Sequence, residues 1–253
     1  MPELPEVEAY RELAERVVGR VIVGVGTPDP WYVKRGDPHA LVGRTITGVR
    51  RVGKRLLIET DGPTLGLRFG MTGRLVVDGT PGVDALLYSS NDDRSAFDRF
   101  ALRLSTGALV VRDPRRLGGA FIDPDDAALG PDALTITTAQ LRAALAGSEA
   151  PLKARLMDQA RVAGVGNLLA DEVLWRAGLD PARPAGNLTA EESRRLARVL
   201  RSTVADLIRR GGSHTGDLMP ARRPGGRCPL DGAALVRRHV GGRTTWSCPV
   251  HQS

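Results

Sequence analysis

The chain is poor in cysteine, in lysine and in long apolar runs, and these shortages exclude several classes of protein. Among its 253 residues only Cys228 and Cys248 are cysteines, too few for a scaffold held together by disulfides. No apolar stretch approaches the roughly 18 residues of a membrane span. The first six residues are acidic and interrupted by proline, unlike a signal peptide. We therefore expect a cytoplasmic protein that makes no membrane contact.

The scarcity of lysine contrasts with a strongly basic net charge of +7 and a pI of about 10.2. Only Lys34, Lys54 and Lys153 occur among 36 basic residues, so a lysine in this chain is a candidate for a chemical role. Nine arginines and three aspartates lie between residues 201 and 253, so this segment supplies +6 of the total. A solvated basic surface is the simpler interpretation. The charge nevertheless favours a polyanionic partner and an association with the nucleoid.

Hydrophobic periodicity divides the chain into a β-rich part and a helical part. Short β-rich runs predict strands at 21–25, 45–52, 55–59, 65–69, 74–77, 100–104 and 108–111, with Gly53-Lys54 as a hairpin turn. Helical spacing predicts helices over 5–18, 138–146, 151–158, 166–177 and 189–210, the last opened by a capping box from Thr189 to Glu192. Segment 123–132 is typical of a linker. The fold class predicted is α+β, with an N-terminal β-sandwich flanked by helices.

Four segments resemble the family of formamidopyrimidine DNA glycosylases and endonuclease VIII: residues 2–8, 51–55, 151–181 and the cysteine-containing tail. The resemblance implies a bifunctional DNA glycosylase and abasic-site lyase of base excision repair. We expect a monomer that acts on damaged double-stranded DNA. The expected regions are a catalytic β-sandwich domain (1–124), a helical helix-two-turn-helix domain (125–210) and a zinc-finger-like β-hairpin (211–253).

The first segment supplies an amine. Removal of Met1 exposes the secondary amine of Pro2, which titrates near ~8 like other α-amino groups, so a neutral fraction is present at pH 7. The resemblance implies that this amine attacks C1′ of the damaged nucleotide and forms an iminium that drives β- and δ-elimination. Glu3 is the candidate for moving protons at the sugar. Taken alone, Pro-Glu-Leu-Pro is more typical of the start of a helix.

The resemblance assigns phosphate binding to three further residues. Lys54, in the predicted hairpin turn, belongs to the catalytic site, and Lys153 is a further candidate for a phosphate contact. Asn167 follows Gly164 and Gly166, which let backbone amides approach a phosphate ahead of a predicted helix. Helix capping is the alternative role for Asn167.

The tail keeps the family's C-x2-C-x16-C-x2-C frame but changes two of its ligands. Cys228 and Asp231 are followed, after sixteen residues, by Cys248 and His251. Because zinc accepts sulfur, imidazole and carboxylate, we expect one structural Zn²⁺ in an atypical site. His239 in place of Asp231, or a hairpin without zinc, are the alternatives.

Excision of a base from a duplex requires the base to be extruded and the void to be filled. The resemblance assigns the filling to Met71 and Arg115, and it places Leu117 where the family has phenylalanine. A buried core methionine is the alternative for Met71, and leucine stacks poorly, so the opposite-base preference should differ. Arg243 matches the arginine that clamps the phosphates of the damaged site, a task that suits a guanidinium. One more arginine in a basic tail is the alternative.

The segment from Gly211 to Arg227 is shorter than in family members that excise 8-oxoguanine. We therefore expect oxidised pyrimidines, ring-opened purines or abasic sites to be better substrates than 8-oxoguanine. The alternative function is a damage-binding protein of the same fold with little or no glycosylase activity. Retention of Pro2 and Glu3 argues against it, since binding alone needs neither. A general zinc-ribbon protein does not explain the segment 151–181.

Overall fold

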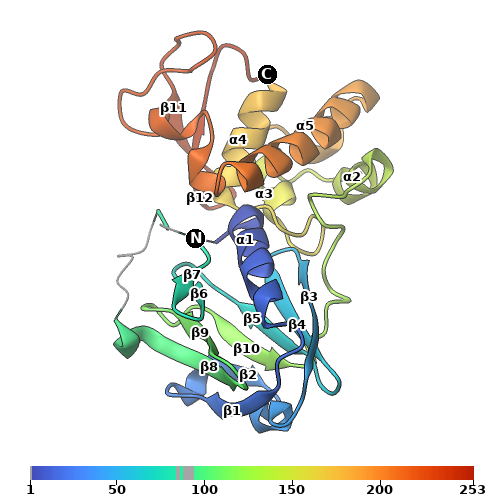
Figure 1. The fold of residues 1–253 in the computed structure, drawn as a ribbon. Coiled ribbons are helices and arrows are strands. Elements are labelled where there is room, and N and C mark those ends of the chain that lie inside the picture. Colours follow the sequence, from blue (N-terminus) through green and yellow to red (C-terminus); the bar gives the residue numbers. More distant parts are fainter. Residues whose placement is uncertain (1, 84–85, 88–93) are drawn as a thin grey trace. The chain divides into compact units, whose positions relative to one another are not determined.

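The computed structural model describes residues 2–83, 86–87 and 94–253, drawn in Figure 1. The chain divides into two compact units, Met1–Ala127 and Ala128–Ser253, with the boundary inside the segment expected to be a linker. Residues 211–253 belong to the same compact unit as the helices that precede them.

Two five-stranded sheets make up the first unit. One has the order β1-β8-β9-β6-β7 and the other β2-β10-β5-β4-β3. Their bounds are β1 (Ile22–Gly26), β8 (Asp98–Leu104), β9 (Ala108–Arg112), β6 (Arg74–Val77), β7 (Thr80–Pro81), β2 (Val33–Arg35), β10 (Gly119–Ile122), β5 (Leu65–Arg68), β4 (Arg55–Thr60) and β3 (Ile46–Val52). The seven predicted strands are confirmed, and the two apolar faces enclose one core, as expected for a β-sandwich.

Three strands were not predicted, because each lacks the alternating pattern of a half-buried strand. β2 has three residues and β7 only two, one of them Pro81. β10 begins with Gly119 and pairs in parallel with β2 and antiparallel with β5, so its place depends on partners distant in the sequence.

Helix α1 (Leu4–Ala14) contacts β3, β4 and β6 of the same unit, beside which Figure 1 draws it. It buries Val7, Tyr10 and Leu13, one stripe at helical spacing. The helix begins at Leu4, earlier than predicted, because a capping box between Glu3 and Glu6 satisfies its first amides and a proline is tolerated in the first turn. Past Ala14 the predicted helix tightens into a 3₁₀ turn.

The second unit contains the predicted helices and a two-stranded hairpin. The helices are α2 (Thr138–Leu145), α3 (Leu152–Met157), α4 (Asn167–Ala177) and α5 (Ala190–Arg209), and the hairpin pairs β11 (Val236–Val240) with β12 (Arg243–Ser247). Helix α4 is central, because it contacts α3, α5 and β12. Gly241 and Gly242 form the hairpin turn with φ of +57° and +73°, a conformation that glycine adopts without strain.

Short 3₁₀ turns connect these elements: Glu15–Val17, Pro30–Tyr32, Pro38–Leu41, Ser95–Phe97, Ala185–Asn187, Ser213–Thr215 and Met219–Ala221. In the described part of the chain, no helix combines the length and the apolar character that crossing a membrane requires.

The first turn of α5 confirms the predicted capping box and adds an ion pair. Thr189 accepts the Glu192 amide, Glu192 accepts the Thr189 amide, and Arg183 donates to both carboxylate oxygens of Glu192 at 2.6 and 3.0 Å. These hydrogen bonds, chiefly those from Arg183, lower the pKa of Glu192 to about 2. Since the folded pKa lies below the unfolded one, the stabilisation is complete above the unfolded value of 4.5 and is lost as the pH falls towards 2.

We predict that Glu192→Gln lowers the free energy of unfolding at pH 7 by about 0.5–1.5 kcal/mol, because glutamine keeps the capping box but loses the ion pair. Urea unfolding at pH 7 and pH 3 measures the effect, and the difference from wild type should shrink at the lower pH. Glu191→Gln, in the same turn, is the matched control and should change little. An equal deficit at both pH values would contradict the ion-pair origin.

Candidate nucleic-acid interface and metal site

Pro2 and Glu3 lie directly before helix α1, and hydrogen bonds to the first turn of the helix hold Glu3. The Glu3 amide donates to Glu6 Oε2 at 2.8 Å, and the Glu3 carboxylate accepts the Glu6 amide in return. Glu3 is buried, with only 1% of the residue exposed. The segment therefore does start a helix. That role is compatible with a catalytic one, since the capping box holds Glu3, the neighbour of Pro2, in a defined place.

The turn that carries Lys54 is tied to the same helix. Arg51 Nε of β3 donates to Glu8 Oε2 of α1 at 2.6 Å, and another nitrogen of its guanidinium donates to the carbonyl of Gly53 at 2.9 Å. Gly53 has φ of +57°, as the predicted two-residue turn requires. Lys54, which is half-buried, thus lies on a hairpin tip that is anchored to the helix following Pro2.

Met71, Arg115 and Leu117, which are expected to fill the void left by an extruded base, belong to two turns that are in contact. Arg115 Nη1 contacts Met71 Sδ at 3.7 Å, and a Cβ on Gly70 would lie 2.4 Å from the carbonyl carbon of Leu117. Arg115 is exposed, Leu117 is 47% exposed and Met71 is half-buried, so Met71 is not a core methionine.

Asp113 joins these two turns from behind. Its side chain is fully buried, accepts the Thr72 hydroxyl at 2.6 Å through Oδ1 and accepts the Gly118 amide at 2.8 Å through Oδ2. Thr72 Oγ1 in turn accepts the Arg115 amide at 3.3 Å. Sequence analysis missed Asp113. The available signal was an aspartate that precedes a proline, a common way to start a turn.

Asn167 is the first residue of α4 and does not cap it, since Gly166 occupies the N-cap position. Its Oδ1 is buried and finds no hydrogen-bond partner among residues 2–83, 86–87 and 94–253. The side chain of Gln159 orders the preceding turn, donating to the Val165 carbonyl at 2.9 Å and accepting the Gly164 amide at 3.0 Å. This oxygen of Asn167 only accepts hydrogen bonds, so a contact from Asn167 to a phosphate would have to come from its side-chain NH2 group.

Lys153 and Arg243 occupy contrasting environments. Arg243, at the start of β12, is exposed. Lys153 is fully buried, with its Nζ 2.7 Å from Asp171 Oδ1 and 2.8 Å from Thr245 Oγ1. Arg243 can therefore reach a phosphate, whereas protein groups surround the ammonium group of Lys153. Its placement gives no support to the expected phosphate contact.

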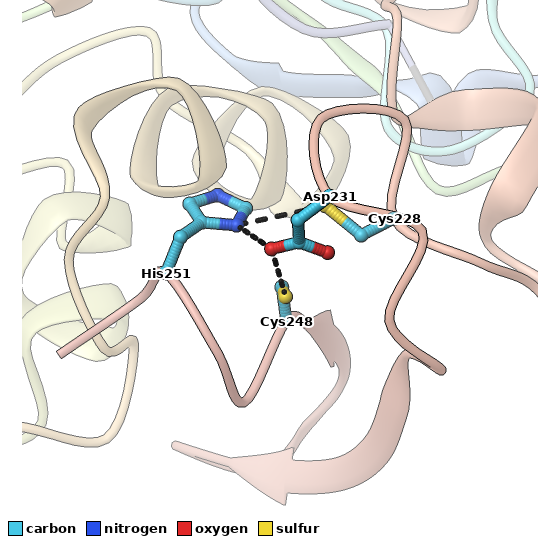
Figure 2. A group of neighbouring side chains, drawn as sticks. All are labelled: Cys228, Asp231, Cys248 and His251. Carbon is cyan, nitrogen blue, oxygen red and sulfur yellow. Dashed lines mark hydrogen bonds and ion pairs between the residues drawn. The ribbon is translucent and has the colours of Figure 1, made fainter.

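Cys228, Asp231, Cys248 and His251 converge in the tail, as Figure 2 shows. Their ligand atoms all lie within 4.8 Å of one another, with Asp231 Oδ2 2.9 Å from His251 Nδ1 and 3.1 Å from Cys248 Sγ. His239, the alternative fourth ligand, is not in this group. These four side chains could hold a metal ion.

Neighbouring groups orient this cluster. The Trp175 indole donates to Cys228 Sγ at 3.3 Å, and His251 Nε2 lies 3.2 Å from the Trp175 carbonyl, which leaves Nδ1 facing the other ligands. Hydrogen bonds from the Ala233 amide, the Cys248 thiol and His251 hold the pKa of Asp231 far below its usual range. Two sulfurs, an imidazole and an ionised carboxylate are a donor set that zinc accepts, so the residues fit that metal.

The short segment after α5 is packed against α4. Glu172 accepts the amides of Asp217 and Leu218 at 2.9 and 3.0 Å, and Arg176 donates to both Glu172 and Asp217 at 2.7 Å. Leu218 is buried in a small apolar cluster with Trp175 and the two cysteines. Side chains of α4 therefore hold this segment in place.

Comparisons with known proteins agree with this arrangement. The family profile of the formamidopyrimidine-DNA glycosylase N-terminal domain matches residues 1–120, and that of the formamidopyrimidine-DNA glycosylase H2TH domain matches residues 128–218. Both profiles describe domains of formamidopyrimidine-DNA glycosylases, which are DNA repair enzymes. The chain belongs to the formamidopyrimidine-DNA glycosylase family.

Full-length relatives support the assignment. The chain is 35% identical to the formamidopyrimidine-DNA glycosylase of Alkalilimnicola ehrlichii, over 98% of this chain and 99% of that protein. It is 38% identical to that of Thermus thermophilus, over 100% and 98%. Lactococcus lactis Fpg, solved with a THF-DNA and an inhibitor, superposes with a TM-score of 0.85 at 28% identity, each chain being covered completely. The same protein was also solved with DNA containing an oxidised pyrimidine (TM-score 0.84, 27% identity, both chains covered completely).

The close packing of Gly70 on Leu117 can be tested by adding one methyl group. We predict that Gly70→Ala lowers the free energy of unfolding by about 2–4 kcal/mol, because its φ of +57° disfavours alanine and the new Cβ meets the Leu117 backbone. Gly79→Ala is the matched control, since its φ is +80° and its Cβ would meet no described atom within 4 Å. It should cost only about 1 kcal/mol. Equal losses in urea unfolding would show that the two turns are not tightly packed.

Proposed function

We propose that the chain is a bifunctional DNA glycosylase and abasic-site lyase whose nucleophile is the amine of Pro2 after removal of Met1. One observation carries the proposal: Pro2 directly precedes Glu3, which a capping box fixes at the start of α1, and the Lys54 turn is anchored to the same helix. A loose N-terminus would have to be ordered in every reaction cycle. A fixed one presents the amine in a reproducible position.

The proposed reaction first removes the base and then breaks the strand. The Pro2 nitrogen attacks C1′, the bond from C1′ to the base breaks, and the base leaves with a proton. The C1′–O4′ bond then opens, O4′ takes up a proton, and C1′ forms an iminium with the Pro2 nitrogen. Because the iminium withdraws electrons, loss of a proton from C2′ expels the 3′ phosphate, and a second elimination, which removes a proton from C4′, expels the 5′ phosphate. Water then hydrolyses the iminium and regenerates the amine. Glu3 is placed beside the amine in sequence and is our candidate for the proton transfers.

DNA binding is proposed for the remaining candidates according to their placement. Lys54, Asn167 and Arg243 would bind phosphates through their side-chain N–H groups, because phosphate oxygens only accept hydrogen bonds. Met71, Arg115 and Leu117 would fill the void left by an extruded base. Two observations support this, the contact between Met71 and Arg115 and the exposure of Arg115 and Leu117.

Zinc is proposed as a structural ion held by Cys228, Asp231, Cys248 and His251. Bound there, it would staple the hairpin region to α4 through the neighbouring Trp175, and it would supply no chemistry to the reaction. The preference for oxidised pyrimidines, ring-opened purines or abasic sites over 8-oxoguanine stays a prediction. The anchored segment around Asp217 and Leu218 supports it, since this segment already has its partners on α4.

The nucleophile can be tested by borohydride trapping on a duplex that carries an abasic site, with any affinity tag placed at the C-terminus. We predict a covalent adduct that maps by mass spectrometry to the tryptic peptide Pro2–Arg11. Insertion of alanine between Met1 and Pro2 turns the Pro2 nitrogen into an amide and should reduce trapping on the order of 100-fold or more. Duplex binding should persist in that variant.

Two outcomes would contradict the proposed nucleophile. An adduct on a lysine peptide would place the amine elsewhere. Binding of the abasic duplex by the unaltered protein without any trapping would support the alternative, a damage-binding protein with little activity.

The metal proposal predicts about one zinc per chain and a loss of zinc affinity of at least about 100-fold in Asp231→Ala and in His251→Ala. Elemental analysis and competition with a chromophoric chelator measure both quantities. His239→Ala removes the imidazole of β11, and this variant should bind zinc like the wild type. Wild-type protein that is folded but free of zinc after purification in zinc-containing buffer would favour the hairpin without metal.

A further inference from the structure

A buried carboxylate on α4 connects three elements of the second unit. Asp171 Oδ1 lies 2.7 Å from Lys153 Nζ of α3, and Asp171 Oδ2 lies 2.7 Å from a guanidinium nitrogen of Arg222. The same Oδ2 accepts the amide of Trp246 in β12 at 3.3 Å. The side chains of Lys153 and Asp171 are fully buried, and that of Arg222 is only 6% exposed.

Hydrogen bonds from the Lys153 side chain extend this network towards Arg243, whose guanidinium is exposed. Its Nζ donates to Thr245 Oγ1 at 2.8 Å and to the Thr244 carbonyl at 3.2 Å. Thr245 Oγ1 in turn donates to the carbonyl of Arg243 at 3.0 Å. A chain of two hydrogen bonds therefore runs from the ion pair to the backbone of Arg243.

Helix α3 also supports the hairpin turn through close packing. A Cβ on Gly241 would lie 2.6 Å from the Cβ of Ala154, so the turn and the helix are already in contact. Arg243 is thus placed from two sides, by the turn that rests on α3 and by the hydrogen bonds that start at Lys153.

We infer that Lys153 and Asp171 are positioning residues for Arg243: their buried ion pair fixes β12, and Lys153 affects phosphate binding through Arg243 without touching a phosphate. The inference rests on the proposed phosphate-binding role of Arg243. Its physical basis is that a buried pair is costly to break, since the remaining charge loses its partner. The hairpin is consequently held in one position against α3 and α4. The backbone of Arg243 is then already ordered, which lowers the entropic cost of DNA binding.

Positioning and direct contact predict opposite effects when the Asp171 charge is removed. If Lys153 bound a phosphate itself, Asp171→Asn would remove a competing anion, and DNA affinity would stay equal or rise. If Lys153 and Asp171 hold the hairpin, the same variant weakens binding although the protein has become more positive.

The first experiment measures affinity for an abasic-site duplex against salt concentration. We expect Asp171→Asn to bind about tenfold more weakly at 0.1 M salt, with the slope of log K against log salt smaller by about one unit, as in Arg243→Ala. The double variant should match Arg243→Ala alone. Asp158→Asn makes the same charge change at an exposed carboxylate and should not weaken binding. Unchanged or tighter binding by Asp171→Asn, or effects that add in the double variant, would overturn the inference.

The second experiment needs no DNA and separates this inference from the proposed function. Hydrogen exchange at the amides of Thr244 to Trp246 should be at least about tenfold faster in Asp171→Asn than in the wild type. Thr245→Val removes the hydroxyl that links Lys153 to Arg243 without changing the charge, and it should also accelerate exchange. This variant serves as the test if Asp171→Asn does not fold. If Arg243→Ala leaves binding and its salt slope unchanged, the role proposed for Arg243 fails even where exchange confirms the positioning. Unchanged exchange in the variants would refute the positioning itself.

Discussion

Buried carboxylates that accept hydrogen bonds from the surrounding loops hold several turns of this protein in place, among them the turns that carry Met71 and Arg115. Asp113 takes the Thr72 hydroxyl and the Gly118 amide, and Glu172 takes the amides of Asp217 and Leu218. A buried carboxylate is stable only where donors surround it, so each of these acids dictates the path of the chain nearby. Loops of irregular sequence thereby acquire one conformation without a core of their own.

The arginines fall into two groups, those enclosed in the protein and those exposed to solvent. Arg51 and Arg222 are almost enclosed and pair with acids, so their charges are neutralised inside the protein. Arg115 and Arg243 are exposed on turns that other residues hold. Pairing inside the protein removes the enclosed arginines from the charge that a ligand meets, whereas the exposed guanidinium groups contribute to it. A polyanion then meets positive groups whose backbone is already ordered, which lowers the entropic cost of binding.

The sequence was sufficient for the parts of the fold that depend on local pattern. Alternation located seven strands, and helical spacing with the capping box at Thr189 located α5 almost to the residue. The sequence was insufficient for elements whose structure depends on partners far away in the chain. Gly119 to Ile122 becomes an interior strand only because β2 and β5 lie on either side of it. The candidate site divides in the same way, since motif spacing located the ligand group of the tail, but Asp113 carried no pattern of its own.

Lys153 shows why residue rarity is an incomplete guide. Its scarcity in an arginine-rich chain correctly marked it as unusual, yet the reason for a lysine there is spatial. The site is fully buried and offers one carboxylate, one hydroxyl and one carbonyl to a single nitrogen. A compact ammonium can donate to the hydroxyl and the carbonyl and form an ion pair with the carboxylate from one point, whereas the planar guanidinium of arginine has five donors to satisfy in the same space. Sequence alone cannot separate a lysine chosen for a phosphate from one chosen for such an enclosure, because burial is set by the packing of α3 against α4 and β12.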